Sequence, residues 1–341
     1  MDATGGPAPA EVPTGAVPGG VPLPPRGRRF RQEARAFWAI MRANPLTLVG
    51  FVLVVLLALV AGLVVLVPAV TGLFGHSISL YPYDPINGFT TNRLQAPSSS
   101  HWLGTDDSGR DTFSRVLAAL PVDLAIAFAI TLFGVAVGGA LGLVAGYWNE
   151  PWTVGGAVSS LILRLADIFL SVPTLLLSLA VVTVLGRGVW QPLVALMITW
   201  WPYYTRLVRG EVLSIKQQPF ITAARAAGVG DFTIVRRHVL RNLLEPIVVY
   251  FTMDLGTVIV VFSTISFIAN PLPASLPEWG RMTEGYVNYF PAYPWPIISV
   301  SLAIIVTVLA FSLLGDGLRD ILDPRSRRVL AQAGAAGESE R

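Results

Sequence analysis

The sequence has no cysteine, a single lysine and three histidines among its 341 residues. The absence of cysteine excludes disulfides, thiol nucleophiles and cysteine-ligated metals. The one lysine, Lys216, lies in the sequence Ser-Ile-Lys-Gln, so no Gly-Lys-Ser/Thr loop is present to cradle nucleotide phosphates. No His-Glu-x-x-His motif occurs either. We therefore expect that the chain is not an enzyme and has no catalytic residue, metal site or cofactor of its own.

Charge is scarce as well. Charged residues make up 13% of the sequence and hydrophobic residues 53%, whereas an ordinary soluble domain has roughly 25% charged residues. Such a composition over a chain of this length predicts that lipid is the solvent for much of it. The formal net charge of only +3 gives no indication of nucleic-acid binding.

Six apolar segments are each about long enough to cross a membrane as a helix, which takes roughly 20 residues. Five contain no charged residue, and the sixth contains Asp254 alone. Hydrocarbon cannot hydrogen-bond the backbone, so such segments must be helical. We therefore predict an all-α membrane protein with six transmembrane helices, at residues 46–70, 124–148, 168–186, 188–205, 246–268 and 295–315.

Basic residues are distributed asymmetrically around these segments. With a cytoplasmic N-terminus, seventeen Lys and Arg fall on the inner side in residues 26–45, 206–245 and 319–328 alone, and five fall on the outer side. Because cytoplasmic loops carry an excess of Lys and Arg, we predict that both termini are cytoplasmic. The expected regions are a disordered tail 1–25, a basic amphipathic segment 26–45 on the lipid surface, a transmembrane domain 46–318 with outer loops 71–123 and 269–294 and a cytoplasmic loop 206–245, and a cytoplasmic tail 319–341.

The cytoplasmic loop contains the sequence PFITAARAAG at residues 219–228. Pro219 suits the first position of a helix, and the alanines favour a helix with a small-residue surface. Gly228 predicts its end, and Asp231 is expected to cap a second helix. A short helix of this kind can enter a groove on a partner, although an alanine-rich turn by itself is more often an ordinary surface loop.

Two outer segments allow two interpretations each. Loop 269–294 is rich in Trp and Tyr, which is typical of an aromatic belt at the membrane interface or of a surface for a delivery protein. The turn at 104–111 either holds the outer loop together or contacts a binding protein, because its polar residues can bond backbone groups and Arg110 can pair with an acid. Its spacing lacks the Gly and Glu of a calcium loop. The residues of interest in this turn are Gly104, Thr105, Asp106, Gly109, Arg110 and Asp111.

Two features lie within the apolar segments. Glycines spaced four apart, from Gly134 to Gly146, form a ridge that lets another helix approach closely, either within the chain or at a subunit seam. Asp254 lies near the middle of its segment, where a carboxyl group is costly and usually functional. It either faces a translocation path or is a hydrogen-bonded packing residue.

Several motifs resemble a known family. The segment 219–228 resembles the EAA motif of bacterial importer permeases, with Thr222 in place of the motif's first acid and Ala223, Ala224 and Gly228 at matching positions. More closely, the chain resembles the C-type permease subunit of dipeptide, oligopeptide and nickel ABC importers. Three other stretches carry this resemblance: HWLGTDDSGRD at 101–111, PEWGRM at 277–282 and LGDGLRD at 314–320, the last followed by Asp323-Pro324-Arg325.

The resemblance implies the type I ABC importer permease fold and an assembly. The partners would be a second homologous permease subunit, two ATPase subunits that bind ATP and Mg²⁺, and an extracytoplasmic substrate-binding protein. Small peptides are the expected substrate class, with oligosaccharides and metal chelates as alternatives. An ion-coupled secondary transporter is the alternative from another class. The implied ATPase-coupling residues are Pro219, Thr222, Ala223, Ala224, Arg225, Gly228 and Asp231.

Overall fold

A computed structural model describes residues 44–73, 78–273 and 275–322 of the chain. The expected tail 1–25, nearly all of segment 26–45 and the part of the C-terminal tail after residue 322 lie outside the described residues. The described residues form helices joined by loops, and the one β pairing among them is an isolated bridge between Thr105 and Asp111. The prediction of an all-α fold is confirmed for this part of the chain.

The helices account for most of the described sequence. In chain order they are α2 (Pro45–Leu73), α3 (Thr112–Phe133), the π-helical segment η1 (Gly134–Gly138), α4 (Gly139–Tyr147), α5 (Val154–Leu170), α6 (Thr174–Leu185), α7 (Trp190–Lys216), α8 (Pro219–Ala226), α9 (Asp231–Ile234), the π-helical segment η2 (Val235–Val239), α10 (Leu240–Ala269), α11 (Trp279–Val287) and α12 (Trp295–Leu322).

Four continuous helical stretches are long and apolar enough to cross a membrane, namely Pro45–Leu73, Thr112–Tyr147, Asp231–Ala269 and Trp295–Leu322. The helices α5 and α6 would add a fifth span if they are counted as one bent unit. The expected fourth span corresponds to the first part of α7, which is 27 residues long and rich in Trp and Tyr, and which continues into the predicted loop 206–245.

The expected third span, 168–186, is not one helix. Helix α5 starts earlier, at Val154, and ends at Leu170, and α6 departs from it at an angle of 84°. The break coincides with Pro173, which has no N–H to donate and disfavours helical geometry at Val172 before it. The apolar run therefore predicts where this segment lies in the sequence, but it does not predict the bend between two helices.

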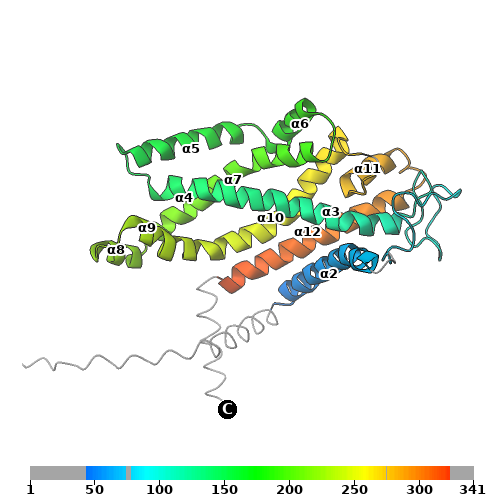
Figure 1. The fold of residues 1–341 in the computed structure, drawn as a ribbon, viewed down its shortest axis with the longest axis horizontal. Helices are drawn as coiled ribbons and strands as arrows, with labels where there is room; N and C mark the ends of the chain where they lie inside the picture. The colour runs from blue at the N-terminus through cyan, green and yellow to red at the C-terminus, as the bar shows by residue number, and fades with distance from the viewer. Residues whose placement is uncertain (1–43, 74–77, 274, 323–341) are drawn as a thin grey trace, which may run out of the picture.

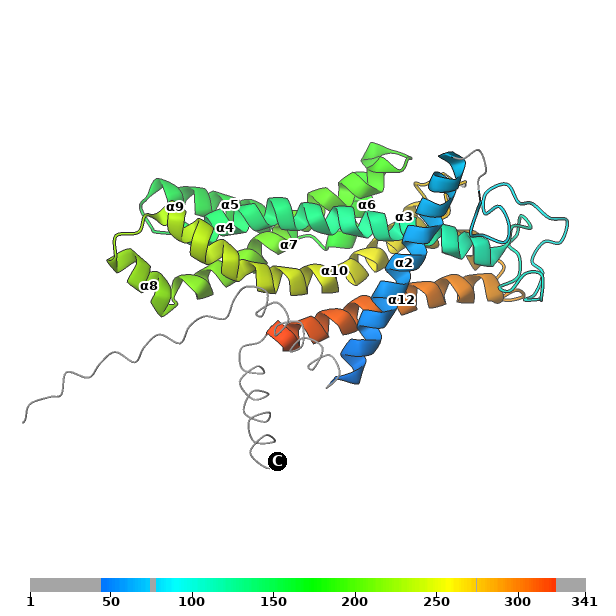
Figure 2. The same ribbon diagram turned by 60° about the horizontal axis from the view of Figure 1, so that its bottom comes forward.

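Helix α2 lies on the outside of the bundle. It crosses α12 at a large angle (Figure 2), and most of its large side chains are exposed. The crossing is close because Gly50 faces Leu313 and Leu314, and Gly317 of α12 faces Thr47. An outer helix with an apolar surface on nearly all sides is expected where the surroundings are lipid.

The glycine ridge packs against α7 within the same chain. A Cβ atom at Gly134 would meet the Tyr204 ring at 2.7 Å, and one at Gly146 would meet Val212 at 2.8 Å. The hydroxyl of Thr205 donates a hydrogen bond of 3.2 Å to the carbonyl of Gly138. Of the two interpretations, packing within the chain is therefore the one that the structure supports.

The bundle has two distinct ends. Helices α8 and α9 lie at one end, and the loop 78–111 lies with α11 at the other (Figure 1). The long helices α3–α4 and α10 run between the two ends, and α12 runs from the α11 end towards the middle of the bundle (Figure 1). We call these the α8 end and the α11 end.

Candidate functional sites

Helix α8 begins and ends where the sequence predicts. Pro219 is the first helical residue, where its missing N–H is not needed. After the helix, Gly228 has a φ of +76°. The N–H of Gly228 donates to the carbonyl of Arg225 (2.9 Å), and that of Val229 donates to Ala224 (3.1 Å). A Cβ at position 228 would meet no atom within 4 Å, so the left-handed backbone rather than crowding requires glycine here.

One face of α8 is anchored and the other is free. Ile221 is fully buried, whereas Thr222, Ala223 and Arg225 are exposed and Ala224 is half-buried. The Ile221 side chain packs into an apolar group, here called the lower cluster, which comprises Tyr147, Val208, Val212, Ile215, Ile221, Ile234, Val235, Val239 and Leu243. The small residues predicted to meet a partner are therefore accessible in the chain as it stands.

The prediction that Asp231 caps a second helix is wrong. Helix α9 begins at Asp231 itself, and the residue before it, Gly230, is the N-cap without a side-chain hydrogen bond. An N-cap residue has a non-helical backbone, whereas the backbone is already helical at Asp231, so its side chain does not cap the helix. Its carboxylate instead accepts a hydrogen bond of 2.6 Å from the hydroxyl of Tyr147. This bond ties α9 to the end of α4.

Tyr147 is a central residue at this end that the sequence analysis missed. It is 2% exposed, and its ring lies 5.3 Å from the Lys216 ammonium and 5.7 Å from the Arg225 guanidinium. Its carbonyl accepts a hydrogen bond of 2.6 Å from Lys216, and its hydroxyl raises the pKa of Arg225. Tyr147 thus joins α4 to α7, α8 and α9. An aromatic residue at the end of an apolar segment was a signal for it, but its hydrogen-bond partners, 69 and 84 residues away, were not readable from sequence.

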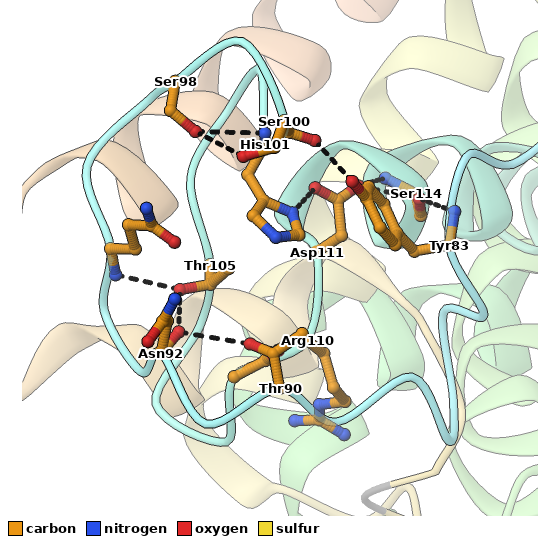
Figure 3. A network of polar contacts seen from close by, with 12 residues as sticks. Tyr83, Thr90, Asn92, Ser98, Ser100, His101, Thr105, Arg110, Asp111 and Ser114 are labelled. Carbon is orange, nitrogen blue, oxygen red and sulfur yellow. Dashed lines mark hydrogen bonds and ion pairs between the residues drawn. The ribbon is translucent and has the colours of Figure 1, made fainter.

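At the α11 end, two aspartates organise the turn before α3. Both oxygens of Asp111 are used, because Oδ1 lies 2.8 Å from His101 Nδ1 and Oδ2 accepts from the N–H and hydroxyl of Ser114 (2.8 and 2.7 Å). Figure 3 shows Asp111 between these two partners. Asp106 accepts from the Arg110 N–H and Nε (each 2.8 Å) and lies 3.6 Å from Arg115 Nε.

The rest of the turn is equally well bonded. The hydroxyl of Thr105 donates to the carbonyl of Asn92 (2.7 Å) and accepts from the N–H of Gln95 (2.8 Å). Gly104 and Gly109 have φ values of +73° and +81°, which side chains disfavour. Since Thr105, Asp106 and Asp111 are at most 1% exposed, the geometry supports the interpretation of this turn as a lock that holds the outer loop together.

A second site missed from sequence is a buried pair of carboxyl groups, Asp123 of α3 and Glu278 before α11. Both are at most 2% exposed, and the two carboxyl groups lie within electrostatic reach of each other. Glu278 caps α11 by accepting from the N–H groups of Gly280 (2.8 Å) and Arg281 (2.7 Å). Asp123 accepts from the N–H of Trp279 (3.2 Å). Burial raises the pKa of Glu278, whereas the hydrogen bonds that it accepts from the N–H groups of Arg281 and Gly280 lower it.

Asp254 lies in α10 and is 8% exposed. Its Oδ2 accepts hydrogen bonds from Trp200 Nε1 (2.7 Å) and the Tyr204 hydroxyl (2.9 Å), both on α7. The carboxyl group is therefore held in place by the neighbouring helix. Among the described residues, neither a metal-binding group of His, Asp and Glu nor an ion pair at Asp254 is found.

Two relatives cover most of the chain. It is 42% identical over 247 residues to the glutathione transport system permease protein GsiD of Pectobacterium atrosepticum, which covers 72% of this chain and 80% of that protein. It is 35% identical over 287 residues to the dipeptide transport system permease protein DppC of Alkalihalophilus pseudofirmus, which covers 84% of this chain and 88% of that protein.

A solved structure shares the fold. A chain of the MetNI methionine ABC transporter in an inward-facing conformation superposes with a TM-score of 0.52 at 22% identity, over 61% of this chain and 97% of that one. Residues 138–328, which contain α8 and Asp254, match the family described as binding-protein-dependent transport system inner membrane component. The resemblance and the membrane location predicted from sequence are thus confirmed, and the chain belongs to this family of inner membrane transport components.

Proposed function

We propose that this chain is a permease subunit of an ATP-driven importer for small peptides. The relatives named for dipeptide and glutathione transport support the substrate class. The observation that carries the mechanism is the geometry of α8, which is anchored through Ile221 and presents exposed small residues at one end of the bundle. A surface without bulky side chains suits close docking of another protein.

In the proposed assembly, six spans cross the membrane and both termini are cytoplasmic. Four spans are the long apolar stretches, and the α5–α6 pair and α7 are the other two. A second homologous permease subunit forms the other half of the path. Two ATPase subunits, which bind ATP and Mg²⁺, dock at the α8 end, and an extracytoplasmic binding protein docks at the α11 end. This orientation follows from the distribution of basic residues.

The proposed coupling runs from the ATPases through α8 into the bundle. When ATP binding closes the ATPases, α8 moves with them, and the lower cluster and Tyr147 pass the displacement to α4, α7 and α10. The bundle then switches between two states that are biased by ligands at both ends. Asp254 lines the path in this scheme, and the bonded turn 104–111 gives the α11 end a fixed shape.

The test of the function is purification of the intact complex under mild conditions, followed by ATP-driven uptake of a dipeptide into proteoliposomes. We expect two ATPase copies, a second permease and a binding protein to copurify, with uptake that requires ATP. Uptake of a sugar or a metal chelate instead would keep the mechanism and change the substrate. Uptake driven by an ion gradient without an ATPase would overturn the proposal.

The docking surface is tested by Ala223→Trp. Since Ala223 is exposed, the added ring does not disturb the lower cluster, and we expect loss of ATP-driven uptake with normal membrane insertion. Ala223→Ser adds no bulk at the same position and is the matched control, with uptake near wild type. Full uptake by the Trp variant would contradict docking at α8.

A further inference from the structure

The carboxyl group of Asp254 has an unusual set of partners for a residue in a membrane span. Both hydrogen bonds, from Trp200 and Tyr204, go to Oδ2. Oδ1 accepts no hydrogen bond from the described residues, and it is absent from their enclosed polar atoms that lack a partner. One oxygen is therefore fixed, and the other carries no hydrogen bond from the described residues and is not fully enclosed.

No cation balances this group within the described part of the chain. The ion pairs found there involve other residues. An unbalanced carboxyl group at membrane depth is costly, and such residues mark substrate or ion pathways. The two neutral donors fix the position of the carboxyl group without supplying a positive charge.

The surroundings of Asp254 are aromatic. The ring of Tyr203 packs edge-on against that of Tyr204 with centroids 5.5 Å apart. Tyr203 is 47% exposed and lies within electrostatic reach of both Asp254 and Tyr250. Trp200 and Tyr204 turn the polar edges of their rings towards the carboxyl group, whereas Tyr203, beside Tyr204, has a partly exposed ring, and the face of such a ring attracts organic cations. A bare divalent metal would need several more oxygen ligands than this site offers.

We propose that Asp254, with Tyr203 beside it, binds an ammonium group of the transported molecule as it passes through the membrane. This inference rests on the proposed function, because the free amino terminus of a peptide is the ammonium group that such a substrate brings. The open Oδ1 accepts its N–H groups, and Trp200 and Tyr204 are positioning residues that hold the carboxyl group through Oδ2.

The first test compares the uptake of dialanine by the complete reconstituted wild-type complex with its uptake by complexes that carry single substitutions. Asp254→Asn keeps an oxygen for Trp200 and Tyr204 but removes the charge, and we expect the half-saturating concentration to rise roughly 10-fold or more, which matches the loss of a hydrogen bond to a charged group. Tyr203→Leu should raise it about 2- to 10-fold. Asp320→Asn is the matched control, because Asp320 is an exposed residue of α12 outside both proposed docking sites, and its uptake should stay at the wild-type level.

The second test does not depend on which molecule is transported. A membrane-permeable carbodiimide activates the carboxyl group, and methylamine added as the probe then forms an amide that mass spectrometry locates. We expect methylamide at Asp254 in the intact complex and protection from it by excess dialanine. Wild-type complex that carries methylamide at Asp254 but takes up no dialanine would refute the peptide substrate and keep the ammonium site. No labelling at Asp254, or wild-type half-saturation in Asp254→Asn, would overturn the site itself.

Discussion

The two ends of the bundle are built in different ways. At the α11 end, buried charged and polar groups are bonded to one another, and Asp106 and Asp111 each hold several partners. At the α8 end, an apolar cluster anchors one side chain of a short helix whose other face is bare. Directional bonds fix a single shape, whereas apolar packing with an unfilled surface leaves a helix able to join a partner. The comparison indicates that one end is a rigid frame and the other an adaptable contact.

The largest effect is expected from breaking the frame. Asp106→Ala leaves the guanidinium groups of Arg110 and Arg115 without their anion, and these side chains are only 14% and 3% exposed. Removing one partner of buried charges costs about 3–5 kcal/mol, so we expect a large drop in the melting temperature of the purified protein. Asp107→Ala, one residue away, should change the free energy of unfolding by no more than about 0.5 kcal/mol. Equal effects of the two would show that the frame is not held by Asp106.

The next effect separates the two ends. Ile221→Ala removes the buried side chain of α8, which costs about 2–4 kcal/mol for a residue of this size. We expect hydrogen exchange to accelerate in α8 and α9 while the amides around residue 111 stay protected. Thr222→Ala, on the exposed face, serves as the control and should leave exchange unchanged. Faster exchange at both ends in Ile221→Ala would mean that they unfold as one unit.

A pH effect is expected at the carboxyl pair. The folded-state pKa of Glu278 lies above its unfolded value because of burial. The contribution of this group to the free energy of unfolding is therefore fully present below the unfolded pKa, and it is lost as the pH rises through the folded pKa. Between these two values, the free energy of unfolding should fall by about 1.4 kcal/mol per pH unit. Melting temperatures measured from pH 4 upward should decline accordingly, and Glu278→Gln should flatten the curve. An unchanged slope in that variant would assign the decline to another group.

The smallest effect concerns the end of α8. Gly228→Ala places a side chain on a residue with φ of +76° but meets no neighbouring atom, so the cost is about 1 kcal/mol from the backbone alone. Gly210 in α7 also has open space, without a positive φ, and Gly210→Ala should stabilise by up to about 1 kcal/mol. Thermal unfolding of the two variants should therefore shift in opposite directions.

Local features were predictable from the sequence and long-range ones were not. Pro219 and Gly228 mark α8 because each acts on its own backbone. The bonds of Tyr147 to Asp231 and of Asp123 to Trp279 join residues 84 and 156 positions apart, and no local pattern encodes them.

The third span shows the same limit. Its hydrophobicity gave its location, but the turn at Pro173 decides where the chain goes next. An apolar run and a proline both act locally, yet the 84° angle between α5 and α6 depends on what α6 packs against, which only the folded chain reveals.

The helical stretch Asp231–Ala269 has a consequence for the two ends of the bundle. It is continuous over 39 residues, which at about 1.5 Å per residue makes a rod of roughly 58 Å. Its first residue is bonded to Tyr147, and near its far end Ser263 lies directly against Gly280 at the start of α11. The stretch contains the π-helical segment η2 and Pro246, yet it runs without a break from α9 to the contact with the start of α11. One unbroken piece of backbone therefore connects the α8 end of the bundle to the α11 end.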